Sequence, residues 1–323
     1  MTYRVAYTAL PLLALVATAG TASAPEGRAW GDIHVRTMDG ATYEFQSSGE
    51  FVASRSQAGD FEVQLRLEPA GFPSHVSIAS AVAVLVDSTR ASVALRRDSP
   101  LFVDGQPTSV LDSYLELPGG GRIERSKRGY DIYWSDGSSL TIGVRKRHLN
   151  AFLRPAESRR GTLSGLFGNF NGVTGDDVDA SIANLGSGAS SQLQRGLTDL
   201  VGSLLADEGA ALDQEESLFE YEPGQTTWSF RRPIPTRDAT PSALSASRRR
   251  QAKEACKTAG VTDPELLEAC IVDVGYTRDE SFADTAAAVQ ERDVSNWDLD
   301  LASRVDTNIT HSRIAPLVGS TQR

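Results

Sequence analysis

A long succession of short, alternating segments most strongly limits how this chain can fold. Phe61 to Leu67 places apolar residues on one face and polar residues on the other, as a half-buried strand does. The other predicted strands between Thr42 and about Arg154 are His75 to Val86, Ala91 to Arg96, Tyr130 to Trp134, Leu140 to Val144 and Leu149 to Leu153. Turn signals separate them at Asp104-Gly105, Pro118 to Gly121 and Asp136-Gly137. Many short strands at this spacing predict a mainly β protein, an antiparallel β-sandwich or barrel-like sheet.

A glycine-rich loop, Gly161 to Asp179 (GTLSGLFGNFNGVTGDDVD), follows the last predicted strand. It places Asn169, Asn171, Asp176 and Asp177 among glycines, which permit sharp turns with positive φ. Short oxygen-bearing side chains in such a loop either cap turns or converge on a calcium ion. Spacing alone leaves both interpretations open, because the pattern is not that of an EF-hand and lacks its closing glutamate.

Two stretches of the sequence resemble one known family. GLFGNFNGVTGDD resembles the G-L-C-G-N-[FY]-[DN]-G-x-x-x-[DN]-D signature of von Willebrand factor type D domains, and Trp30 to Phe45 (WGDIHVRTMDGATYEF) resembles the opening strand pair of that family. The resemblance covers roughly Trp30 to Arg232. It implies a calcium ion, and the residues that match the calcium ligands of the family are Asp39, Asn169, Asn171, Asp176 and Asp177. Asn171 would contribute either its backbone carbonyl or its side chain.

Cysteine content separates this chain from the cysteine-rich members of the family. The sequence has only Cys256 and Cys270, and both lie beyond the resemblance. Phe167 occupies the position of the cysteine in the G-L-C-G motif, and Ser164 stands where its partner would be. We therefore predict a cysteine-poor, bacterial-type relative in which packing, with Phe167 and Trp30 as fillers, replaces the disulfides of the family.

Helical periodicity appears after the loop. Leucines from Ser190 to Ala206 recur at helical spacing and predict an amphipathic helix packed on the sheet. Ser217 to Phe230 resembles the closing segment of the family, and we expect Trp228 to close the core. Further helices are predicted for Ser247 to Ala259, from the N-cap Thr262 with Pro264 in the first turn, and for Asp279 to Asp293.

The two cysteines fall one on each of the first two helices of this C-terminal region. In an oxidising compartment we expect Cys256 and Cys270 to pair and to staple a helical hairpin. Two free thiols or a metal-binding pair are the alternatives, although zinc would need further His or Cys ligands nearby.

The predicted domain organisation follows from these segments. Residues 1–24 have the layout of a secretory signal peptide, with a cut after Ala22 or Ala24. Residues 25–232 form the type D-like domain, 233–247 a linker rich in Pro, Ser and Thr, 248–295 a small helical module, and 296–323 a flexible tail.

Charge and missing motifs narrow the function. The net charge of −10 without a basic stripe argues against nucleic acid, and no later segment is apolar over enough residues to predict a membrane span. No G-x-S-x-G elbow, H-E-x-x-H motif or phosphate loop occurs. Some mucin relatives are cleaved at the Asp-Pro bond of a G-D-P-H sequence, but Ile33 replaces the proline here, so we do not expect that cleavage.

We therefore expect a secreted, calcium-stabilised, non-enzymatic module for adhesion, matrix assembly or protein contact, whose partner is an extracellular protein or a matrix or surface component. Two alternatives stay open. One is a secreted hydrolase that uses Asp32 and His34, which a deep pocket around His34 would favour. The other is a lipid- or surface-binding domain, which an open apolar cavity or a broad exposed apolar patch would favour.

Overall fold

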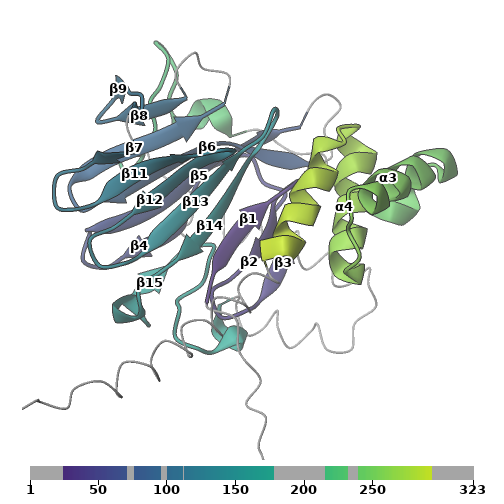
Figure 1. Cartoon of the computed structure of the whole chain (residues 1–323), viewed down its shortest axis with the longest axis horizontal. Helices are drawn as coiled ribbons and strands as arrows, with labels where there is room; N and C mark the ends of the chain where they lie inside the picture. Colours follow the sequence, from purple (N-terminus) through teal and green to yellow (C-terminus); the bar gives the residue numbers. More distant parts are fainter. Residues whose placement is uncertain are drawn as a thin grey trace, which may run out of the picture. The chain divides into compact units, whose positions relative to one another are not determined.

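The computed structural model describes residues 25–70, 76–95, 100–111, 113–177, 215–231 and 239–292, which all belong to one compact unit. In these residues, fifteen strands join in one curled, antiparallel sheet that resembles half of a barrel (Figure 1). The strands are β1 Gly27–Trp30, β2 His34–Arg36, β3 Thr42–Glu44, β4 Gly49–Ser56, β5 Phe61–Pro69, β6 Ser77–Val86, β7 Thr89–Ala94, β8 Leu101–Val103, β9 Gln106–Pro107, β10 Tyr114–Glu116, β11 Arg122–Ser126, β12 Gly129–Tyr133, β13 Ser139–Val144, β14 Leu149–Arg154 and β15 Leu163–Ser164. The predicted mainly β, antiparallel class is confirmed.

The order of the strands brings the start of the chain beside its later parts. The main path runs β10-β11-β12-β13-β14-β6-β5-β4-β15, and β1 pairs with both β14 and β2. The β1–β14 register joins Gly27 to Leu153 and Ala29 to Ala151. The turn after β1 therefore lies at the edge where β14 begins, next to the helices that follow the sheet (Figure 1).

Aromatic packing fills the position of the missing cysteine. Phe167 is fully buried in the main core cluster, and Trp30 is also buried. Gly27 lies against the ring of Phe167 so closely that a Cβ at position 27 would come within 2.7 Å of it. Burial of a phenylalanine side chain contributes about 1.5–3 kcal/mol, so this contact replaces part of what a disulfide would supply.

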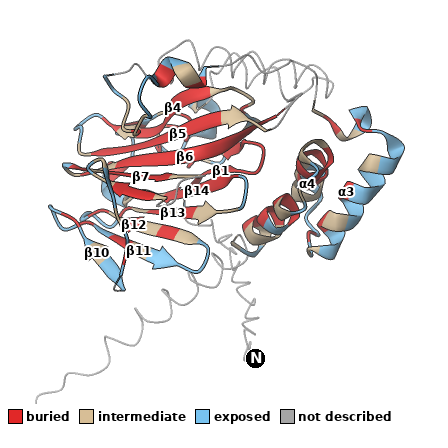
Figure 2. Ribbon diagram, turned by 90° about the horizontal axis from the view of Figure 1, so that it is seen from above, coloured by how far each residue is buried: buried red, intermediate tan, exposed pale blue. Residues whose placement is uncertain are grey.

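Strand β5 is buried on both faces, which differs from the predicted half-buried strand (Figure 2). The polar side chains of Gln64 and Arg66 lie beneath residues 215–231. Gln64 accepts a hydrogen bond from the backbone N–H of Leu218 at 2.8 Å, and the guanidinium of Arg66 lies 3.9 Å from the centre of the Phe230 ring. Residues 215–231 thus cover the polar face of β5. The alternating pattern of β5 alone does not show that this distant segment lies over it.

The closing segment places different residues in the core than we predicted. Trp228 is 61% exposed, whereas Thr227 and Phe230 are buried. Both belong to a 3-10 turn, η3 Thr227–Phe230, in which residues three apart share a face. Trp228 is consequently directed outward, where the guanidinium of Arg231 stacks on its ring at 4.0 Å.

The C-terminal part of the described chain is helical. Helix α3 spans Ala246–Thr258, α4 spans Pro264–Thr277, and a third helix occupies residues 281–292. A disulfide joins Cys256 of α3 to Cys270 of α4, as predicted. The N-cap of α4 is Asp263 rather than Thr262, because the Asp263 carboxylate accepts the N–H groups of Glu265 and Leu266 at 3.0 and 2.9 Å.

Several predicted segments lie outside the described residues: the signal peptide at 1–24, the helix from Ser190 to Ala206 and the tail at 296–323. In the part of the chain that is described, no helix combines the length and the apolar character that crossing a bilayer requires.

Candidate functional site

The glycine-rich loop returns to the turn between β2 and β3. The carboxylate of Asp39 accepts two backbone hydrogen bonds from the loop, from Asn171 N–H at 2.9 Å and from Gly172 N–H at 3.0 Å. The Thr174 hydroxyl donates to the Asp39 carbonyl. One aspartate thereby holds a loop that follows it by more than 130 residues.

The remaining predicted ligands are linked within the loop. The Asn169 side-chain oxygen accepts the N–H of Asn171 at 3.0 Å, and the Asn171 amide donates to Asp176 Oδ2 at 2.6 Å. Asp177 Oδ1 accepts the N–H of Asn169 at 3.0 Å. Gly168 permits this approach, since a Cβ there would lie 2.1 Å from Asp177 Oδ1. The structure thus brings all five sequence-predicted residues to one place.

One acidic oxygen in this group has no hydrogen-bond partner. Asp177 Oδ2 is buried and accepts no hydrogen bond. Burial raises the pKa of Asp177, and the nearby carboxylates of Asp39 and Asp176 raise it further, against the opposing effects of the neighbouring Thr37 side chain and of the Asn169 N–H. A buried oxygen donor beside two more carboxylates and two asparagines fits a calcium ion, which prefers such oxygen ligands.

A second, tighter cluster lies under the helices. In the described residues, one group of three or more His, Cys, Asp or Glu side chains has ligand atoms that all fall within 4.8 Å of one another, and it consists of Asp32, His34 and Asp273. His34 Nε2 lies 3.1 Å from Asp32 Oδ1 and 3.1 Å from Asp273 Oδ1. His34 Nδ1 lies 2.6 Å from Glu44 Oε1. Asp32, His34 and Asp273 are 0%, 5% and 1% exposed.

The backbone of residues 31–33, which carries Asp32 and leads to His34, has an unusual conformation where it faces α4. Gly31 and Ile33 have φ values of 64° and 68°, and a β-branched residue rarely adopts this conformation. Ile33 is fully buried, and its carbonyl accepts the N–H of Phe45 at 3.0 Å. A Cβ at position 31 would lie 2.4 Å from Asp273 Oδ2, so glycine is required for the close approach of α4.

Electrostatics couples the members of this cluster. Burial by itself would lower the pKa of His34, but the carboxylates of Glu44, Asp273 and Asp32 outweigh it and raise this pKa well above its usual value. Burial, followed by the charge of Asp273, raises the pKa of Asp32 well above its usual range. The cluster therefore favours extra positive charge, whether from protons or from a cation.

Sequence reasoning found only part of this cluster. Asp32 and His34 were predicted as a possible hydrolase pair, but their burial counts against that alternative because a substrate could not reach them. Asp273 was not predicted. It lies 239 residues after His34, and its only sequence signal is a lone acidic residue inside the apolar run Cys270 to Val274.

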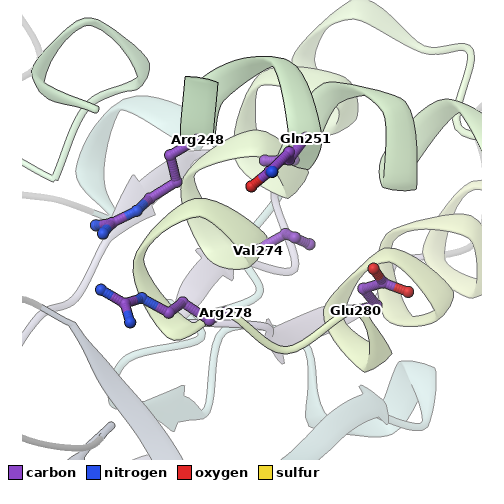
Figure 3. A pocket seen from close by; sticks show the side chains of 6 residues that line it. Arg248, Gln251, Val274, Arg278 and Glu280 are labelled. Atoms are coloured by element: carbon purple, nitrogen blue, oxygen red, sulfur yellow. The ribbon is translucent and has the colours of Figure 1, made fainter. Parts of the chain in front are cut away.

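A pocket of about 390 Å³ lies among the helices, apart from both clusters (Figure 3). Its lining includes Arg248 of α3, Arg278 at the end of α4, and Glu280. The two arginine side chains extend toward the same side, and Glu280 lies on the opposite side. This lining is polar and carries both signs of charge, unlike the apolar cavity that would favour a lipid-binding domain.

Most of the sheet and the whole glycine-rich loop match one known protein family. The model of the von Willebrand factor type D domain matches residues 27–181, which include Asp39 and all of the loop residues. Residues 27–181 form a von Willebrand factor type D domain. The helices that supply Asp273 lie outside the matched residues.

Two human proteins are similar to part of this chain. The IgGFc-binding protein is 30% identical over 169 residues, which are 49% of this chain and 3% of that protein. Mucin-2 is 26% identical over 157 residues, which are 46% of this chain and 3% of mucin-2. This chain therefore corresponds to a small part of each of these relatives.

Proposed function

We propose that this chain is a secreted, calcium-stabilised, non-enzymatic module used for adhesion or protein contact outside the cell. The observation that carries the proposal is the convergence of Asp39 with the loop 169–177 inside a type D domain. The residues that would hold the ion are Asp39, Asn169, Asn171, Asp176 and Asp177.

The ion would supply positive charge where three carboxylates lie close together. Without it, Asp177 keeps a buried oxygen that accepts no hydrogen bond, beside Asp39 and Asp176, which raise its pKa. Asp39 alone fixes the loop to the β2–β3 turn, because its carboxylate accepts the backbone N–H groups of Asn171 and Gly172. We infer that the bound ion adds to a link which the chain already makes by itself.

The proposed location and partner rest on the relatives and on the N-terminus. One relative is by its name a protein that binds the Fc region of IgG, and another is a mucin. An antibody fragment is an extracellular protein, and residues 1–24 have the layout of a secretory signal. We therefore propose an extracellular protein or a matrix or surface component as the partner.

Thermal unfolding tests the calcium part of the proposal. We expect the melting temperature of the purified protein to rise with calcium and to fall with EDTA, because a ligand that binds only the folded state stabilises it. Asp177→Ala should remove this dependence. Asp284→Ala removes an exposed carboxylate in the helix at 281–292 and should preserve it. Identical melting curves of the wild type in calcium and in EDTA would contradict the proposal.

Mass spectrometry tests secretion separately. Expressed with its first 24 residues in a bacterial host, the protein should leave the cytoplasm and begin at Ser23 or Pro25. Recovery only from the cytoplasm with residues 1–24 intact would contradict this part.

A further inference from the structure

We propose that Asp32, His34 and Asp273 form a second metal site, which takes a divalent transition ion such as zinc and joins the type D domain to the helical hairpin. Asp32 and His34 belong to the turn and strand that follow β1, within the matched residues. Asp273 belongs to α4, outside them. The proposal is independent of the calcium loop, because the two sets of residues share no member.

The distances in the cluster suit a shared ion. Zinc binds histidine nitrogen and carboxylate oxygen at about 2.0–2.2 Å, which sets neighbouring ligand atoms about 3.0–3.4 Å apart in octahedral or tetrahedral geometry. His34 Nε2 lies 3.1 Å from Asp32 Oδ1 and 3.1 Å from Asp273 Oδ1. Both nitrogen–oxygen separations therefore match those of neighbouring ligands around one ion, and all three ligand atoms lie within 4.8 Å of one another.

As a carboxylate, Asp32 finds no hydrogen-bond donor among the residues around it. A single N–H at His34 Nε2 can point to only one acceptor, and it aligns with Asp273 Oδ1. Neither oxygen of Asp32 accepts a hydrogen bond, although its side chain is completely buried. Buried polar atoms are almost always satisfied, so two orphaned oxygens, one of which lies 3.1 Å from an imidazole nitrogen, point to a missing partner.

Glu44 completes the arrangement from the opposite side of the imidazole. Its Oε1 lies 2.6 Å from His34 Nδ1 and favours a proton there. When an ion takes the place of the proton on Nε2, the Nε2 lone pair faces that ion between Asp32 and Asp273. Metal-binding histidines commonly donate their other N–H to a carboxylate, which fixes the tautomer and the orientation of the ring.

Ligand chemistry selects a transition ion over calcium. Imidazole suits zinc, copper, nickel and iron, whereas calcium takes six to eight oxygen ligands. A divalent ion would neutralise the charges of Asp32 and Asp273, which are costly to bury unpaired. Because α4 completes and covers the site, the ion would be bound as the hairpin docks, and binding would be coupled to that docking.

Zinc affinity, measured by competition with a chromophoric chelator, tests the site. We expect one zinc ion per chain, about 100-fold weaker binding in Asp273→Asn, and about 10–100-fold weaker binding in Glu44→Gln, which acts only through the imidazole. Asp284→Asn makes the same charge change at an exposed position and should bind zinc like the wild type. Wild-type zinc binding no tighter than that of Asp273→Asn would overturn the proposal.

Nitrogen NMR of the histidine rings uses the wild-type protein, so it tests the site even if a variant fails to fold. Zinc should shift the His34 Nε2 resonance and leave Nδ1 protonated. An unchanged His34 spectrum at saturating zinc would overturn the proposal and leave protons as the neutralising charge. Asp39→Ala should keep zinc binding, so failure of this site and failure of the calcium loop are distinguishable.

Discussion

Two acidic residues of one motif, Asp32 and Asp39, have opposite surroundings. Asp32 is completely buried, and neither of its oxygens accepts a hydrogen bond. Asp39 lies in a partly exposed turn, and both of its oxygens accept backbone N–H groups. Asp32 lies next to Asp273 of helix α4, whereas Asp39, seven residues later, binds the loop 169–177. The motif therefore makes two connections, one to helix α4 and one within the type D domain.

The energies of the two connections should differ accordingly. Removal of one partner from a buried charged network typically costs about 3–5 kcal/mol, whereas exposed ion pairs contribute about 0–1 kcal/mol. We therefore expect the Asp32 cluster to dominate stability and the Asp39 loop to respond mainly to calcium.

The largest expected effect is that of His34→Ala. The substitution leaves the carboxylates of Asp32 and Asp273 buried together without the imidazole that lies 3.1 Å from each. We expect a loss of about 3–5 kcal/mol in the free energy of unfolding, measured with urea in EDTA. A loss below about 1 kcal/mol would break the contrast between the two sites.

Two buried histidines beneath the helices should titrate with opposite effects on stability. Burial lowers the pKa of His148 to about 4; its Nε2 lies 2.9 Å from the Thr285 hydroxyl. Because this folded-state pKa is below the unfolded value, its contribution is present above about pH 6.5 and is lost as pH falls toward 4. The pKa of His34 is raised, so its contribution is present below about pH 6.5 and is lost as pH rises through the folded-state pKa.

The effect of His148 can be measured by itself from the loss of stability between pH 6.5 and 4. Replacement of His148 by glutamine should make the loss of unfolding free energy between pH 6.5 and 4 smaller by about 2–3 kcal/mol, because each pKa unit corresponds to about 1.4 kcal/mol. Urea unfolding across this pH range provides the slopes. Parallel curves for the variant and the wild type would contradict the assigned cause.

A smaller effect is expected at the exposed loop. Thr174→Val removes the hydroxyl that donates to the Asp39 carbonyl while keeping a similar shape. In EDTA it should reduce the free energy of unfolding by about 1 kcal/mol, the usual value of one hydrogen bond. A loss as large as that of His34→Ala would mean that the loop is a principal source of stability.

The smallest effect should come from Trp228→Ala. Trp228 is 61% exposed and its ring contacts the guanidinium of Arg231, so the unfolding free energy should change by no more than about 0.5 kcal/mol. A loss of several kcal/mol would restore the tryptophan to the core and contradict the observed η3 turn.

Local sequence patterns predicted the strands and the glycine-rich loop. They did not predict which distant segments pack on these elements. Alternation identified the strand at Phe61, and glycine spacing with family resemblance identified the partners of Asp39. The burial of Gln64 depends on residues 215–231, and the cluster at His34 depends on Asp273, 239 residues away. Such contacts arise from tertiary packing between distant segments. The periodicity and the turn residues of one segment do not predict them.

Calcium titration calorimetry of the purified protein measures whether Asp39 and the loop 169–177 bind the ion. Wild type should bind one calcium ion, and Asp39→Ala and Asp177→Ala should lose this binding while Asp284→Ala keeps it. Absence of calcium binding by the wild type, or unchanged binding by the Asp39→Ala protein, would contradict the claim that Asp39 and the loop 169–177 form a calcium site.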